Sequence, residues 1–91
     1  MALFQLQITP AALRDIEKRI PRKLRPGVER AIDKLRDDPF PHGAKPLHGI
    51  PNLYRIRVGD YRIVYSTDRK AQLVTVEKIG HRKEVYRFLS R

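Results

Sequence analysis

Three arginines on one face of a predicted β-hairpin form the group with the clearest chemical potential in this chain. Residues 54–65 (YRIRVGDYRIVY) alternate apolar and polar side chains around a Gly-Asp dipeptide at 59–60, which is typical of two-residue hairpin loops. This turn pairs Arg57 with Arg62 and places Arg55 on the same face, since side chains alternate along a strand. Like charges that face each other destabilise a sheet, so the arrangement predicts a site that holds an anion.

A second group of reactive side chains follows the last predicted strand. Arg82 contributes a guanidinium, His81 an imidazole and Tyr86 a phenol. Beside the arginine face, these groups would suit cleavage of RNA, in which the 2′-hydroxyl attacks the adjacent phosphate. Fixed cations would stabilise the negative charge that develops on the phosphate. Because arginine stays protonated at neutral pH, the protons must be moved by Tyr86, His81 or the RNA itself.

Apolar spacing predicts a strand followed by two helices in the first part of the chain. The strand covers residues 4–8, and the Thr-Pro pair at 9–10 has the form of an N-cap and a first helical residue. The first helix ends or bends at Pro21, and the second begins near Pro26 and stops at residues 37–39. The apolar residues at helical spacing are Leu13, Ile16 and Ile20, then Leu24, Val28, Ala31, Ile32 and Leu35.

The second half of the chain predicts three strands that must position the arginines. Residues 39–51 are punctuated by proline and glycine and predict a loop, and the hairpin over 54–65 follows it. The β-branched run over 73–76 predicts a central strand that Gly80 ends. Residues 83–89 predict a short C-terminal helix.

This order of elements predicts an α+β fold: a strand–helix–helix–three-strand antiparallel meander with both helices on one face of the sheet. Tyr54, Tyr61 and Tyr65 would then face the helices, and the arginines would line the opposite, open face. If the last strand lies beside the strand that begins at Tyr61, the cluster around His81 falls near the arginines.

Composition limits the size of the site and the kind of partner. Ninety-one residues suffice for a single domain over 1–91 but leave no room for a deep cavity, so a site should be a shallow surface groove. A net charge of +10 favours a polyanionic partner. No stretch is long and apolar enough to predict a membrane span, no signal peptide is expected, and the lack of cysteine fits a cytoplasmic protein. The three histidines lack the spacing of a zinc site, and no metal or other cofactor is expected.

Further basic side chains surround the predicted junction between the helices and continue into the loop. They are Lys18, Arg19, Arg22, Lys23 and Arg25 at the junction, and Lys45 and His48 in the loop. Such residues either form an ordinary solvated surface or contact RNA phosphates.

Three blocks of the sequence together resemble the RelE toxins of the RelE/ParE superfamily, which belong to type II toxin–antitoxin systems. The blocks are residues 47–49, 54–65 and 79–86, and the order of elements extends the resemblance over nearly the whole chain. The resemblance implies a RelE-like fold and a toxin that enters the ribosomal A site and cuts mRNA there without a metal. It also implies an antitoxin that wraps the toxin in a heteromeric complex, and the positive charge predicts that its binding segment is acidic and apolar.

The resemblance also assigns roles to individual residues. Arg62 corresponds to the family arginine after the hairpin turn, Arg82 to the arginine after the last-strand glycine, and Tyr86 to the C-terminal tyrosine. Arg55 and Arg57 occupy positions where the best-known member has lysines, one of which is proposed as the general base. This departure moves the base role toward Tyr86 or His81, or implies a weaker nuclease.

Two other functions remain open from the sequence. A ParE-like protein would poison DNA gyrase by binding and would have no need for the arginine set. A catalytically inactive relative would bind RNA or its antitoxin without cutting.

Overall fold

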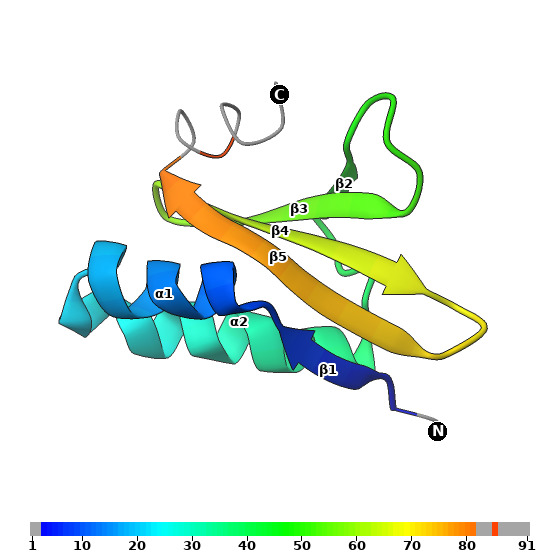
Figure 1. The fold of residues 1–91 in the computed structure, drawn as a ribbon, viewed down its shortest axis with the longest axis horizontal. Helices are drawn as coiled ribbons and strands as arrows, with labels where there is room; N and C mark the ends of the chain where they lie inside the picture. Colours follow the sequence, from blue (N-terminus) through cyan, green and yellow to red (C-terminus); the bar gives the residue numbers. More distant parts are fainter. Residues whose placement is uncertain (1–2, 82–84, 86–91) are drawn as a thin grey trace.

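The computed structural model describes residues 3–81 and Val85. In chain order its elements are β1 (Gln5–Ile8), α1 (Pro10–Arg19), the 3-10 helix η1 (Arg22–Leu24), α2 (Arg25–Asp37), β2 (Lys45–Pro46), β3 (Leu53–Val58), β4 (Tyr61–Asp68) and β5 (Leu73–His81). The strands form one sheet in the order β1-β5-β4-β3-β2. Figure 1 shows α1 and α2 on the same side of this sheet, which confirms the α+β architecture.

The sheet is mixed rather than antiparallel throughout. Strands β3, β4 and β5 form the expected antiparallel meander. Strand β1 instead joins β5 in parallel, because the chain crosses over through both helices before it returns to the sheet. The segment predicted as a loop over 39–51 contains the short strand β2, which pairs with β3 at the other edge.

The register of the β3–β4 hairpin is the one that the sequence predicts. Residues 53–58 pair with residues 61–66, and Arg57 lies opposite Arg62. Gly59 opens the turn at φ 60°, a conformation that glycine adopts without steric strain. The three hairpin tyrosines face the core as expected: Tyr65 is buried there, and Tyr54 and Tyr61 pack against it.

Both helices begin and end close to the predicted residues. The Thr9 hydroxyl accepts the backbone N–H of Ala12 at 3.1 Å, and Pro10 is the first residue of α1, so the predicted N-cap is confirmed. Helix α2 begins one residue before Pro26 and ends at Asp37. None of the helices in the described part of the chain is long and apolar enough to cross a membrane.

The main core lies between the helices and the sheet, and it omits two leucines that helical spacing assigns to it. Leu13 is 48% exposed and Leu24 is 44% exposed. Helix α1 instead buries Ala12, Ile16 and Ile20, which follow each other at intervals of four and therefore share one face. Leu13 lies about 100° around the helix from Ala12 and lines a surface pocket with Leu6 and Ile8 of β1.

Two predictions need correction, one about the end of the last strand and one about the open face of the sheet. Gly80 does not end the last strand: it is buried within β5 opposite Arg62, and the strand continues to His81. The face opposite the helices is not fully open either, because Leu53, Val64 and Val85 form a second buried cluster there, with Leu47 against it. The helix expected over 83–89 falls outside the described residues apart from Val85.

The buried hydroxyl of Tyr65 should make the free energy of unfolding depend on pH in the alkaline range. Its hydroxyl donates to Pro39 O at 2.8 Å, and burial, aided by Tyr54 and Asp38, raises its pKa well above the ordinary value. The unfolded chain releases this proton near pH 10 while the folded protein keeps it, so the free energy of unfolding falls as pH rises above about 10.

Urea unfolding at about pH 9 and about pH 11 tests this. Tyr65→Phe cannot lose the proton, so it should remove up to roughly 1.4 kcal/mol per pH unit of the alkaline loss. Tyr61→Phe, at the start of the same strand, serves as the control. Equal alkaline losses in wild type and Tyr65→Phe would contradict the assignment.

Candidate functional site

Two rows of residues cross the face of the sheet opposite the helices and gather its basic side chains. One row consists of Arg57, Arg62 and Gly80, and the next consists of Lys45, Arg55, Val64 and Lys78. Directly paired residues point to the same face of a sheet, so the three predicted arginines share this face. The structure adds Lys45 from the edge strand β2, whereas the ammonium of Lys78 pairs with Asp15 of α1 at 3.1 Å.

A surface pocket of about 340 Å³ opens at the hairpin end of this face. Its walls are Arg57, Gly59, Asp60, Arg62 and His81. The structure therefore brings together three residues that the sequence marks as candidates, Arg57, Arg62 and His81. Two guanidinium groups on neighbouring strands form a setting that suits a phosphate group.

Arg62 is the most unusual residue of this pocket. It is 4% exposed, and its Nε has no hydrogen-bond partner among the residues that the structure describes. Buried donors are almost always paired, and an unpaired one costs about 1–3 kcal/mol. An oxygen of a bound anion could supply the missing acceptor.

His81 stands at the rim of the pocket, at the exposed end of β5. Its ring meets the ring of Tyr61 edge to face, with the centroids 6.1 Å apart at 84°. Because His81 pairs with Tyr61, its ring lies on the Tyr61 side of the sheet, while the residue forms part of the pocket wall. Arg82 and Tyr86 lie outside the described residues, so their roles stay predictions.

The other basic residues singled out in the sequence divide into two groups. Lys18, Arg22, Lys23 and Lys45 are exposed, as contacts to RNA phosphates would require. Arg25 instead donates to Ile20 O at 3.1 Å and to Glu17 O at 2.6 Å. These carbonyls lie at the end of α1, so the guanidinium of Arg25 caps that helix and is committed to the fold.

Two acidic residues near the site were not singled out in the sequence. Asp60 lines the pocket, although the hairpin pattern explains it equally well as a turn residue. Asp15 is buried on α1, and the available signal was its position between Ala12 and Ile16 on the apolar side of the helix. Within residues 3–81 and 85, no three His, Cys, Asp or Glu side chains gather as potential metal ligands.

Removing one of the two opposed arginines should stabilise the free protein. Arg57→Gln relieves the repulsion from Arg62, so we expect the free energy of unfolding to rise by roughly 0.2–1 kcal/mol. Inorganic phosphate at constant ionic strength should raise the Tm of wild type more than that of Arg57→Gln. Thermal unfolding with and without phosphate measures both effects, and Arg36→Gln on α2 is the matched control. Equal responses to phosphate would argue against an anion at this pair.

The sequence profile of the family described as "ParE toxin of type II toxin-antitoxin system, parDE" matches residues 6–86. The chain therefore belongs to the RelE/ParE superfamily of type II toxins, as its sequence blocks predict.

RelE-type toxins are similar to the chain over nearly its whole length. Toxin RelG of Mycobacterium tuberculosis is 30% identical over 84 residues, which cover 92% of this chain and 97% of RelG. Toxin RelE of the same organism is 32% identical over 85 residues, or 92% of this chain and 87% of that toxin. The archaeal RelE–RelB complex from Pyrococcus horikoshii contains a chain that superposes with a TM-score of 0.77 at 25% identity, over 90% of this chain and 97% of that one. The expected RelE-like fold is confirmed.

Proposed function

We propose that this toxin stops translation by cutting mRNA in the ribosomal A site. The observation that carries the proposal is Arg62, a buried arginine whose Nε lacks an acceptor and which lines an open pocket with Arg57 and His81. A buried donor that lacks an acceptor costs stability, and a phosphate oxygen of RNA would supply that acceptor.

The proposed reaction uses the RNA itself as the nucleophile. The ribose 2′-oxygen loses its proton and bonds to the adjacent phosphorus, and the bond from phosphorus to the 5′-oxygen breaks. The products are a 2′,3′-cyclic phosphate and a 5′-hydroxyl, which takes up a proton. Arg57 and Arg62 would stabilise the charge on the phosphate oxygens, because fixed donors bind the transition state more strongly than the ground state.

The proton transfers in this scheme fall to His81 and Tyr86. Arg55 and Arg57 are poor bases because a guanidinium stays protonated at neutral pH. An imidazole has an ordinary pKa near neutrality and can both take and give a proton. His81 at the pocket rim therefore suits one transfer, and Tyr86 suits the other or stacks on a base.

We also propose that an antitoxin covers the basic face of the sheet in a heteromeric complex. The supporting observations are the net charge of +10 and the likeness to toxins whose structures were solved with RelB. An acidic and apolar segment would pair with the arginines and pack beside the cluster of Leu53, Val64 and Val85. Adding the cognate antitoxin in equal amount should stop cleavage.

A cell-free translation reaction tests the proposed activity. Purified toxin is added with and without ribosomes, and the mRNA 5′ ends are mapped by primer extension. We expect cuts at A-site codons only when ribosomes and wild-type toxin are both present. Cuts without ribosomes would indicate a free ribonuclease, and intact mRNA with normal translation would contradict the proposal.

Gyrase poisoning is the second candidate, because the matching family profile is that of the ParE toxins. In this case the toxin would bind gyrase and leave mRNA intact. Accumulation of cleaved DNA in a gyrase supercoiling assay, together with intact mRNA, would favour it over RNA cleavage.

A further inference from the structure

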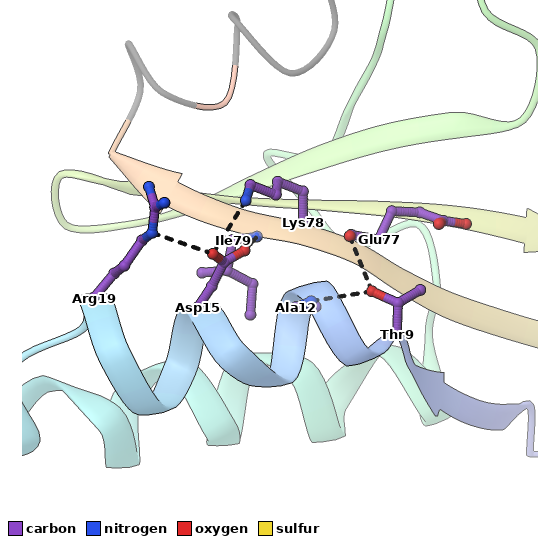
Figure 2. Close-up of polar contacts among 7 residues, drawn as sticks. All are labelled: Thr9, Ala12, Asp15, Arg19, Glu77, Lys78 and Ile79. Atoms are coloured by element: carbon purple, nitrogen blue, oxygen red, sulfur yellow. Dashed lines mark hydrogen bonds and ion pairs between the residues drawn. The ribbon is translucent and has the colours of Figure 1, made fainter.

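The outer edge of β5 changes its hydrogen-bond partner halfway along the strand. From Leu73 to Val76 it pairs with β1, and the backbone N–H of Thr9 donates to Val76 O at 3.0 Å where β1 ends. Beyond Val76, the N-cap and side chains of α1 replace β1 as the hydrogen-bond partners of this edge. The Thr9 hydroxyl donates to Glu77 O at 3.1 Å while it accepts the N–H of Ala12, as Figure 2 shows.

Asp15 continues this role further along α1. Its side chain is 3% exposed, and Oδ2 accepts the backbone N–H of Ile79 at 3.1 Å. Oδ1 accepts from Lys78 Nζ at 3.1 Å and lies 3.6 Å from Arg19 Nε. In Figure 2 these groups converge on the carboxylate from both the helix and the strand. Removing the carboxylate would leave a buried N–H unpaired, a loss that buried polar groups make costly.

These contacts hold β5 at an irregular point of its register. Val64 pairs with Lys78 while the next residue of β4 pairs with Val76, so Glu77 is the extra residue of a β-bulge. The bulge lets Val76 and Ile79 both face the core although they are three residues apart. A slip of one residue would turn every side chain beyond the bulge to the other face of the sheet.

The stretch that Asp15 holds leads directly into the candidate site. Gly80 pairs with Arg62, and His81 lines the same pocket. We propose that Asp15 is a positioning residue of this toxin, whose bond to Ile79 keeps Gly80 and His81 at the register that the pocket requires. The inference rests on the proposed function for its effect on RNA, but the hold on β5 can be measured without cleavage.

The test compares Asp15→Ala and Asp15→Asn with Asp33→Ala, which removes an exposed carboxylate from α2. Amide hydrogen exchange reports on Ile79 and Gly80, and the NMR resonance of the His81 ring is followed during titration with inorganic phosphate. In Asp15→Ala we expect exchange at Ile79 to accelerate at least about tenfold more than in the core strand β4. The His81 resonance should shift, and its response to phosphate should weaken.

Cleavage is the second readout. Asp15→Ala should lower kcat at least about tenfold with a smaller change in KM, because the reacting groups are misplaced rather than lost. Asp15→Asn keeps an oxygen that can accept the Ile79 N–H, so it should recover most of the exchange protection and of kcat. Asp33→Ala should resemble wild type in every readout.

The outcomes separate this inference from the proposed function. Uniform acceleration of exchange throughout the sheet, with an unchanged His81 resonance, would reduce Asp15 to a general stabiliser and overturn the inference. If Asp15→Ala does not fold, a failure of Asp15→Asn to retain the Ile79 protection and the His81 resonance would overturn it equally. If wild type cuts no RNA while Asp15→Ala still loosens Ile79 and displaces His81, the positioning stands and the nuclease proposal falls.

Discussion

Replacing Arg62 with methionine is expected to abolish mRNA cleavage without destabilising the protein. Methionine fills a similar volume but carries no charge and no unpaired donor. Loss of a fixed cation that binds the reacting phosphate should lower the cleavage rate by about 10²–10³-fold. Because the Nε of Arg62 has no hydrogen-bond partner within residues 3–81 and 85, the free energy of unfolding should stay equal or rise by roughly 1–3 kcal/mol.

The opposite signs of the two effects make this variant informative. Removing a buried arginine that has a structural role would lower the free energy of unfolding, whereas removing one that is retained for its ligand would raise it. Cleavage in the cell-free translation reaction and urea unfolding measure the two quantities, with Arg36→Met on α2 as the exposed control. Arg62→Lys should also lose most activity, since an ammonium lacks the planar fork of donors. Full activity in Arg62→Met would rule out the proposed anchor.

Ile16→Ala is expected to have the largest effect on stability among the helix positions considered. Ile16 is 7% exposed and belongs to the main core, so its truncation should cost about 2–5 kcal/mol. Domains of this size have a total free energy of unfolding of about 5–15 kcal/mol, so the variant would lose a large part of its stability.

Leu13→Ala provides the matched comparison three residues earlier on the same helix. Leu13 is 48% exposed, so the same kind of truncation should cost less than about 0.5 kcal/mol. Urea unfolding of both variants measures the difference. Similar losses in the two would show that Leu13 is buried in solution and that the helix is rotated from the orientation described above.

Local sequence patterns predicted the structure correctly wherever the interactions that determine it join residues close together in the chain. The Gly-Asp turn at 59–60 fixed the hairpin register, and the alternation of side chains then put Arg55, Arg57 and Arg62 on one face. Thr9 and Pro10 defined the start of α1 for the same reason, because a helix cap is completed within one turn.

Sequence patterns failed where the position of an element depends on a partner far away in the chain, or where either of two faces of a helix could pack against the core. The sequence could not show that β1 joins β5 in parallel, that β5 continues past Gly80, or that Leu13 faces solvent while Ala12 is buried. Each depends on how α1 is rotated and docked against the sheet. Propensity and periodicity restrict such choices, but the packing of the whole core selects among them.

By itself, then, the sequence determined the family, the order of the elements and the arginine face, because these follow from short-range alternation, turns and caps. Only the tertiary structure decided that the Nε of Arg62 is buried with no hydrogen-bond partner among the described residues, that Lys45 joins the arginines, and what holds β5 in register. The burial of Arg62 supports its proposed role as an anchor for an anion. The proposed role of Asp15 depends on its contact with Ile79, 64 residues away. Burial and contact between distant segments are properties of the packed chain, and no local pattern encodes them.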